Sequence, residues 1–382
     1  MRPASAGRSR VCVRASHGAR EDFEMYEPSS LGFGPFFASQ LGPRDGPDPV
    51  PARIAAEHRG AYEAWSCAGA NPARLAGRLR RELEGQALPG VGDWVVLAGA
   101  PRPDELAVIE RVLERRTQFT RGAAGRAARV QVVAANVDLV FVVCGLDEDF
   151  NVRRLERYLA RVGASGAEPA VILNKADLCG DVAGRAAEVE RRLGGVPVLV
   201  TSALGRAGLE AVRARVHAGV TVALVGSSGA GKSTLVNALL GEERLPTGPV
   251  RASDGRGRHV TTHRQLVLLP AGGLLLDTPG MRELELVDED GLDVAFADLT
   301  ALAARCRYRD CRHEAEPGCA VRAAVESGAL DPEQVEHHQQ LAREARAFEL
   351  RHDHRKRRQE ARRWGQLADE LARLRRFKGG KE

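Results

Sequence analysis

One glycine-rich segment limits the possible folds of this chain more than any other feature. It reads Gly226-Ser-Ser-Gly-Ala-Gly-Lys-Ser-Thr234 and fits the phosphate-loop pattern G-x-x-x-x-G-K-S/T, in which Lys232 reaches the β- and γ-phosphates. A strand-like run, Val220 to Val225, precedes the segment, and a helix-like run, Leu235 to Leu240, follows it. This order predicts an α/β domain in which successive backbone N–H groups surround phosphate oxygens. The predicted phosphate contacts are Gly226, Ser227, Ser228, Gly229, Ala230, Gly231, Lys232, Ser233 and Thr234.

Further residues fit the binding of Mg²⁺ beside the phosphates. The hydroxyl of Ser233 is the magnesium ligand in the phosphate-loop pattern. Asp277-Thr-Pro-Gly280 ends another strand-like run and matches a motif in which Asp holds Mg²⁺ through water and the Gly280 N–H senses the γ-phosphate. A polar, glycine-containing stretch from Gly255 to His263 lies between the two motifs. Of its two adjacent threonines, Thr261 is the one expected to complete the Mg²⁺ shell.

A phosphate loop alone does not distinguish ATP from GTP, but two further motifs bear on the base. Asn174-Lys-Ala-Asp177 follows a strand-like run, at the strand end where open α/β sheets bind ligands. The Asp177 carboxylate can accept two hydrogen bonds from guanine that adenine cannot supply, and the Asn174 amide can bridge the base and phosphate loops. Taken alone, this motif also fits a helix cap. Ser202-Ala-Leu204 follows the next strand-like run, where a backbone N–H can bond guanine O6. The predicted base contacts are Asn174, Lys175, Ala176, Asp177, Ser202, Ala203 and Leu204.

The order of these motifs differs from that of an ordinary GTPase. There the phosphate loop comes first, and Asp-x-x-Gly, Asn-Lys-x-Asp and Ser-Ala-x follow. Here Asn174 to Asp177 and Ser202 to Leu204 precede the phosphate loop, which predicts a circular permutation. The permuted domain then begins near the buried-type strand at Asp138, and the segment after Gly280 leads directly into the C-terminal region. Hydrolysis could therefore move that region.

The length of 382 residues predicts more than one domain. Short β-like runs between turn residues, from Ala52 to Thr120, suggest a small closed barrel of about five strands, of OB-fold type. Its Tyr62, Trp65 and Trp94 are interpreted as core residues rather than base-stacking ones. The fold is therefore predicted to be multidomain, with a disordered arm at 1–48, an OB-fold barrel at 49–125, a circularly permuted α/β P-loop GTPase domain at 126–288, a helical zinc-binding domain at 289–335 and a basic helical extension at 336–382.

Four metal-binding side chains crowd into fourteen residues of the C-terminal region: Cys306, Cys311, His313 and Cys319. Three thiolates and one imidazole are the ligand set of a closed, tetrahedral, structural zinc site. A catalytic zinc would need an open ligand position, so it is disfavoured, and a metal-free buried cluster is the remaining alternative. Zinc here would replace a core that so short a segment cannot build.

The net charge of +5 is concentrated at the C-terminus. Residues 339–382 contain 14 Lys/Arg and 7 Asp/Glu, so this segment has a charge of +7 and the rest of the chain −2. The basic run from Arg351 to Arg358 is interpreted either as a contact to RNA phosphates or as a solvated helix face. No apolar run long enough for a membrane span and no export signal are evident, so we expect a cytoplasmic protein without a membrane partner.

The permuted motifs, Ala134-Ala-Asn-Val-Asp138 and the segment from Cys306 to Cys319 closely resemble the ribosome small-subunit-dependent GTPase family, known as RsgA, YjeQ or EngC, over about residues 50 to 335. The resemblance implies a monomeric enzyme that hydrolyses GTP to GDP and phosphate with Mg²⁺, carries one structural Zn²⁺, and binds the 30S subunit and its 16S rRNA late in assembly. It also implies slow intrinsic turnover that the subunit stimulates. The family's His-Thr-Thr-Thr segment reads His259-Val-Thr-Thr here.

The residue that orients the catalytic water is not the one that Ras-like enzymes use. They place Gln just after Asp-x-x-Gly, where this chain has Met281, whose thioether cannot do so. His259 is the predicted catalytic residue, and the family resemblance points to the same histidine; contact with RNA or solvent only is its other interpretation. Two other functions remain open on the residues alone: a P-loop ATPase or nucleotide kinase, and a non-hydrolysing, GTP-dependent RNA-binding adaptor.

Overall fold

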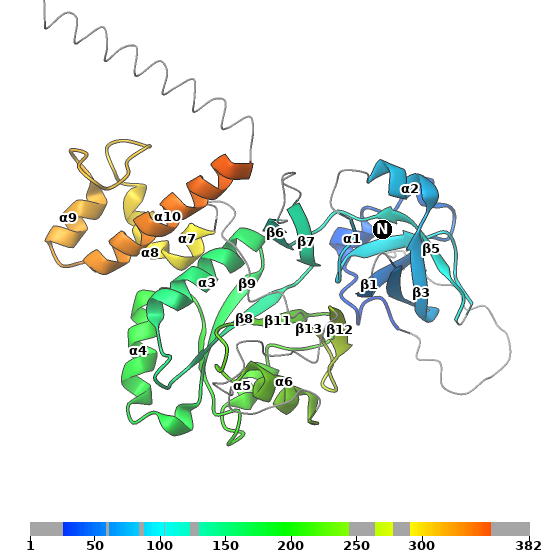
Figure 1. The fold of residues 1–382 in the computed structure, drawn as a ribbon, viewed down its shortest axis with the longest axis horizontal. Coiled ribbons are helices and arrows are strands. Elements are labelled where there is room, and N and C mark those ends of the chain that lie inside the picture. Colours follow the sequence, from blue (N-terminus) through cyan, green and yellow to red (C-terminus); the bar gives the residue numbers. More distant parts are fainter. Residues whose placement is uncertain are drawn as a thin grey trace, which may run out of the picture. The chain divides into compact units, whose positions relative to one another are not determined.

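The computed structural model describes residues 26–58, 61–83, 88–102, 104–122, 130–243, 264–277 and 291–352. The chain divides into two compact units, residues 1–285 and 286–382. The first unit contains a β-barrel and an α/β domain, and the second is helical (Figure 1).

The barrel consists of five strands in the described residues. They are β1 (Val50–His58), β2 (Ala61–Ser66), β3 (Gly69–Leu75), β4 (Trp94–Leu97) and β5 (Ala107–Val112). The strand order is β1-β2-β3-β5-β4, and β4 pairs again with β1, which closes the barrel. The pairing of β3 with β5 is parallel and the others are antiparallel. Helix α2 (Gly77–Glu82) follows β3. The predicted five-stranded barrel is confirmed.

Alternating side chains of these strands fill the barrel, among them Ile54, Val95 and Ile109. Tyr62 and Trp94 are 3% and 1% exposed, and Trp65 is 8% exposed. All three are buried, as expected of core residues.

Residues 26–48 are structured, which differs from the disordered arm expected over 1–48. They include the short helices α1 (Pro35–Ala38) and η1 (Pro43–Asp45). Phe37 is buried, and the ring of Phe33 lies 4.9 Å from that of Trp94. Apolar side chains in this irregular segment thus cover the barrel without any periodic pattern that would have predicted it. Residues 1–25 lie outside the described part.

The α/β domain is built on a mostly parallel sheet with the order β10-β9-β8-β11-β13-β12. Its strands are β8 (Leu139–Gly145), β9 (Glu168–Asn174), β10 (Val198–Val200), β11 (Thr221–Val225), β12 (Gln265–Leu268) and β13 (Leu274–Asp277). Only β12 is antiparallel to its neighbour in this sheet. β12 also pairs with β1 of the barrel at Ala56 and Gln265, so one continuous sheet joins the two parts of the first unit.

Helices cover this sheet. They are α3 (Val152–Ser165), η2 (Ala176–Leu178), α4 (Val182–Arg192), α5 (Leu209–Arg213) and α6 (Lys232–Leu240). Leu209 of α5 and Leu235 of α6 pack in one apolar cluster with Phe141 of β8 and Ile172 of β9. Helix α3, whose side chains do not belong to that cluster, contacts β8 and β9 (Figure 1). Because the central strands are parallel, their C-terminal ends meet at one edge of the sheet.

A buried arginine connects the barrel to the start of the α/β domain. Arg53 of β1 is 1% exposed and donates hydrogen bonds to the carbonyl oxygens of Leu31, Gly92 and Asn136, the last at 2.8 Å. Burial lowers the pKa of Arg53 to about 9. Asn136 directly follows the ribbon of β6 (Gln118–Gly122) and β7 (Val130–Ala135) and lies shortly before β8, which begins at Leu139.

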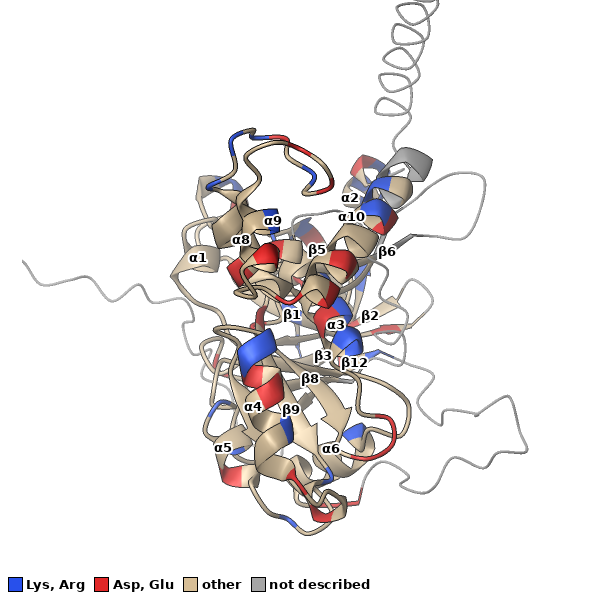
Figure 2. Cartoon of the chain, turned by 90° about the vertical axis from the view of Figure 1, so that its left-hand side faces the viewer, with Lys and Arg blue, Asp and Glu red and all other residues tan. Residues whose placement is uncertain are grey.

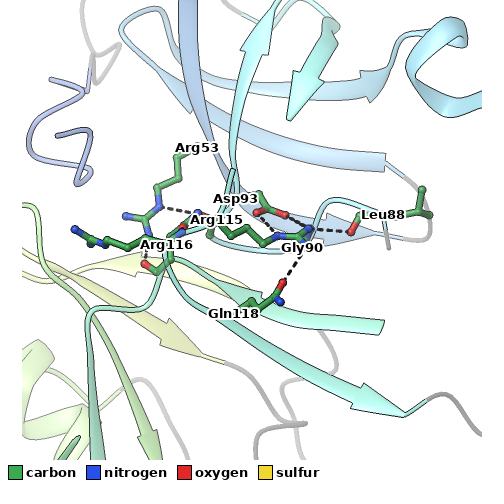
Figure 3. Close-up of polar contacts among 9 residues, drawn as sticks. Arg53, Leu88, Gly90, Asp93, Arg115, Arg116 and Gln118 are labelled. Atoms are coloured by element: carbon green, nitrogen blue, oxygen red, sulfur yellow. Dashed lines mark hydrogen bonds and ion pairs between the residues drawn. The ribbon is translucent and has the colours of Figure 1, made fainter. Parts of the chain in front are cut away.

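The Asp93–Arg115 ion pair lies next to Arg53 (Figure 3). Arg115 donates from two nitrogens to the two carboxylate oxygens of Asp93, each at 2.7 Å, and Asp93 is fully buried. Charged and amide groups at this junction are therefore paired with one another or with the main chain, which fixes the barrel relative to the ribbon that leads into β8.

The second unit contains helices α7 (Leu292–Ala295), α8 (Ala297–Ala303), α9 (Ala320–Glu326) and α10 (Pro332–His352) within the described residues. Phe296, Leu299, Val321 and Leu341 form its buried interior. The boundary expected between 335 and 336 falls inside α10. The described part of α10 carries both acidic and basic side chains (Figure 2). Most of the predicted basic run, from Asp353 to Arg358, lies outside the described residues.

Candidate functional site

The phosphate loop connects β11 to α6 at the C-terminal edge of the sheet. Two of its glycines, Gly226 and Gly231, leave no room for a side chain. Gly226 has φ of 141°, and a Cβ atom there would lie 2.1 Å from the carbonyl oxygen of Val143. Gly231 has φ of 91°, and a Cβ atom there would lie 2.2 Å from Nδ2 of Asn174. The loop therefore packs its backbone directly against β8 and against the end of β9.

Lys232 folds back over this loop. Its Nζ donates to the carbonyl oxygen of Gly226 at 2.8 Å and to that of Ser227. Ser233 and Thr234 stand in the first turn of α6, whose N-terminus faces the loop. A cationic side chain and a helix N-terminus at one concave turn attract an anion such as phosphate.

Asn174 connects the phosphate loop with the base motifs. Its Nδ2 donates to the carbonyl oxygen of Ala230 at 3.0 Å. Its Oδ1 accepts from the backbone N–H of Ala203 at 3.0 Å and from the hydroxyl of Thr201 at 3.1 Å. Asn174 is 2% exposed, so its amide is a buried bridge between three chain segments. The bridging position expected from the sequence is the one that the structure has.

The remaining base-motif residues lie around this bridge. Asp177 is exposed in η2, and its carboxylate accepts a hydrogen bond from the Ser202 hydroxyl. The N–H of Ala176 donates to the carbonyl oxygen of Thr201 at 3.1 Å, which joins the two motifs again. Lys175 has φ of 64°, a left-handed conformation, and its Nζ lies 2.5 Å from Oδ2 of Asp147. Leu204 is 83% exposed.

Part of the predicted magnesium and catalytic set lies outside the described residues, namely His259, Thr261 and Gly280. Asp277 is the last residue of β13, which runs parallel to β11 with Leu276 opposite Ala223. The backbone of Asp277 therefore ends at the same edge of the sheet as the phosphate loop. Its predicted role as a magnesium ligand stays a prediction, as do the roles of the other three residues.

Sequence reasoning missed the loop after β8. Its Asp149 forms an ion pair with Arg154 at 2.7 Å, and hydrogen bonds from Arg154 and Ser227 lower the pKa of the Asp149 carboxyl. The position of the loop in the sequence could have indicated it. Because β8 is parallel to β9 and β11, polar residues directly after β8 must lie at the same edge of the sheet as the phosphate loop and the base motif.

The second unit brings together the predicted zinc ligands. The ligand atoms of Cys306, Cys311, His313 and Cys319 all lie within 4.8 Å of one another. Nδ1 of His313 lies 3.4 Å from Sγ of Cys319 and 3.7 Å from Sγ of Cys306. Cys319 caps α9, and its Sγ accepts from a backbone N–H of that helix. Burial raises the pKa of the Cys306 thiol, but backbone hydrogen bonds from residues of α9, together with hydrogen bonds from Cys319 and Cys311, outweigh burial and lower that pKa.

Known proteins share this sequence and fold. The model of the RsgA GTPase family matches residues 112–287. The chain is 49% identical over 328 residues to the small ribosomal subunit biogenesis GTPase RsgA of Opitutus terrae, which covers 83% of this chain and 89% of that protein. The chain belongs to the RsgA GTPase family. A second relative, the small ribosomal subunit biogenesis GTPase RsgA 2 of Vibrio parahaemolyticus, is 46% identical over 322 residues, or 82% of this chain and 84% of that protein.

Solved structures share this fold. YjeQ from Thermotoga maritima is similar with a TM-score of 0.62 and 25% identity, over 78% of this chain and 98% of that chain. YloQ, a circularly permuted GTPase, has a TM-score of 0.59 and 24% identity, over 80% of this chain and 98% of that chain. The predicted resemblance and fold class are confirmed.

Membership in the RsgA family makes the chain a GTP hydrolase and sets aside the alternative of an ATPase or nucleotide kinase. Among the described residues, no helix is long and apolar enough to cross a membrane.

Proposed function

We propose that this chain binds the small ribosomal subunit and hydrolyses GTP during its biogenesis. The observation that carries the proposal is the buried Asn174 bridge, because it joins a phosphate loop to a guanine-type motif within a chain of the RsgA family. The names of the relatives supply the small subunit as the partner. The proposed partner is the 30S particle with its 16S rRNA.

In this proposal the base and phosphates of GTP occupy the edge of the sheet described above. Asp177 accepts from the guanine edge, a two-point contact that selects guanine over adenine. The Ala203 backbone lies beside Asn174 and is held there by the amide, so its neighbour Leu204 can present a backbone N–H to the base. The N–H groups of 226–231 and the Lys232 ammonium neutralise the phosphates.

Mg²⁺ would be held by Ser233 and, in the proposal, by Asp277 and Thr261. The hydroxyl and carboxylate oxygens of these residues are the ligands that magnesium prefers, and the ion neutralises charge on the β- and γ-phosphates. His259 is proposed to orient the attacking water when the chain is bound to the subunit.

Zn²⁺ fits the Cys₃His cluster. Four ligand atoms of the right chemistry converge within 4.8 Å, and they leave no open position for a substrate. Gln339 of α10 donates to the carbonyl oxygen of His313 at 3.2 Å, so the ligand loop is also anchored to the helix. The proposed role of the metal is structural.

Turnover measurements with purified 30S, 50S and 70S particles test the proposal. We expect GTP hydrolysis to be slow alone and stimulated by 30S particles. Hydrolysis that no ribosomal particle accelerates would contradict the partner and favour the non-hydrolysing adaptor if the intrinsic rate were also negligible.

A matched pair of variants tests the catalytic histidine in the same assay. His259→Ala is expected to preserve GTP binding and 30S association but to reduce stimulated kcat by about 100-fold, the usual scale of a lost acid–base or water-orienting group. Met281→Ala is the control and should change kcat little. A His259→Ala variant with near-normal stimulated kcat would show that another group positions the water.

A further inference from the structure

The loop from Gly145 to Asn151 lies between the base motif and the phosphate loop. It starts at the end of β8 and finishes at the cap of α3. In this loop, Oδ2 of Asp147 lies 2.5 Å from Nζ of Lys175. Asp149 is tied to the phosphate loop through Ser227. One short segment thus contacts both halves of the nucleotide site.

A backbone hydrogen bond holds the Asp147 carboxylate in place independently of its contact with Lys175. Its Oδ1 accepts from the backbone N–H of Asp149 at 3.2 Å, which leaves Oδ2 for Lys175. A Cβ atom at position 145 would lie 2.7 Å from the same Oδ1, so a glycine at this strand end lets the carboxylate fold back. Gly145 is directly opposite Asn174 in the β8–β9 register. The carboxylate therefore reaches the residue next to Asn174.

An ion-pair partner that restricts its side chain matters more for Lys175 than it would for a rigid residue. Its four-carbon stem rotates freely in solution, and fixing it upon binding costs conformational entropy. The left-handed backbone at Lys175 fixes where the stem begins, and the ion pair fixes where it ends. Both side chains are partly buried, 28% and 26% exposed, so solvent weakens the pair without removing it.

We propose that Asp147 is a positioning residue for guanine-nucleotide binding. Its carboxylate holds the Lys175 side chain in the conformation that binds the nucleotide, between Asn174 and Asp177. The inference rests on the proposed function of that motif. Asp147 acts through Lys175 and not on the reacting phosphate. Its removal should therefore weaken GDP and GTP equally and leave turnover at saturation unchanged.

Asp147→Asn removes the charge and keeps the shape. The asparagine carbonyl oxygen can still accept from the Asp149 N–H, so the turn is preserved. We expect the Kd for fluorescent GDP and GTP analogues to rise about fivefold, the scale of a partly exposed ion pair, with 30S-stimulated kcat at saturating GTP within about twofold of wild type. Glu148→Gln is the matched control in the same loop, because Glu148 is exposed and has no hydrogen-bond or ion-pair partner among the described residues.

A double-mutant cycle separates positioning from a structural role. Lys175→Met keeps an unbranched apolar stem and removes the ammonium. In that background Asp147→Asn should cause no further loss of affinity. An equal loss in both backgrounds would overturn the proposal, and this remains decisive even if Asp147→Asn lowers the melting temperature, since a stability effect would be the same in both.

Nucleotide selectivity of the wild type separates the assignment of the base motif from the role of Asp147. A wild type that binds GDP no more tightly than ADP would overturn the assignment of the base motif, and the role of Asp147 with it. A guanine-selective wild type with additive losses in the cycle would overturn the role of Asp147 alone.

Discussion

The nucleotide site and the metal cluster are built in opposite ways. All seven residues of β8 are buried, and the site at its end is held by hydrogen bonds among strand ends, such as those of Asn174. Most of residues 304–318, which include three of the four metal ligands, are exposed. An apolar core thus preorganises the first site without its ligand, whereas the loop of the second has little besides its ligands to fold around.

Removing one zinc ligand gives the largest expected effect. Cys311→Ser should abolish tight zinc binding, a loss on the order of 10 kcal/mol of coupled folding free energy, and unfold mainly residues 291–328. Zinc content and limited proteolysis measure this, and GDP binding by the first unit should persist. Cys179→Ser is the control, since this free cysteine lies outside the cluster. Less than about half an equivalent of zinc in wild type purified without chelators would argue against a structural metal.

Changing the base-reading carboxylate tests the preorganised site next. Asp177→Asn retains an acceptor for the Ser202 hydroxyl but loses one of two guanine acceptors. GTP preference should fall by about 3 kcal/mol, with xanthine nucleotides favoured in return. Competition binding of GTP against XTP measures this. Asp181→Asn is the control, because asparagine caps α4 as well as aspartate does. Unchanged GTP-over-XTP selectivity would mean that Asp177 does not read the base.

Deleting the buried bridge should weaken nucleotide binding more than it changes the selectivity for guanine. Asn174→Ala leaves the carbonyl oxygen of Ala230 and the N–H of Ala203 without their partner, at a cost of about 2 kcal/mol. GDP affinity by calorimetry should fall about 30-fold, with the GDP-to-ADP ratio reduced less than in Asp177→Asn. Asn151→Ala, which removes only the cap of α3, should lower stability and leave affinity unchanged. Wild-type affinity in Asn174→Ala would show that the loops keep their geometry unaided.

The smallest expected effect is at the anchor of the metal loop. Gln339→Ala removes two hydrogen bonds to the carbonyl oxygens of Arg312 and His313, worth about 0.5–1 kcal/mol. Zinc affinity in a chelator competition should fall by about threefold, and the melting temperature of the zinc-loaded protein should fall only slightly. Gln340→Ala is the control, because within the described part of the chain Gln340 bonds only to Glu344, on the exposed side of α10. A large destabilisation by Gln339→Ala would mean that protein contacts, more than the metal, hold this loop.

The sequence was most informative where chemistry requires particular residues in a fixed spacing. The phosphate loop, its permuted partners and the Cys₃His set need such residues, so both the fold class and the residues that converge were predictable. Leu31 and Phe37 were not, because they are buried in an irregular segment without periodicity, through contacts far apart in sequence. Asp147 was not predictable for a related reason. A carboxylate after a strand is common, and only the β8–β9 register brings it to Lys175.

The hydrogen bonds of Arg53 determine which fragments of this chain can fold. Its guanidinium has main-chain acceptors before the barrel, inside it and beyond it, at Leu31, Gly92 and Asn136. A fragment spanning only 49–125 would keep one of the three and leave a buried cation short of acceptors, although all five barrel strands would be present. The smallest fragment that retains all three hydrogen bonds of Arg53 therefore extends from about residue 26 to residue 137. Deletion of the barrel alone would also remove the Arg53 contact to the segment that leads into β8.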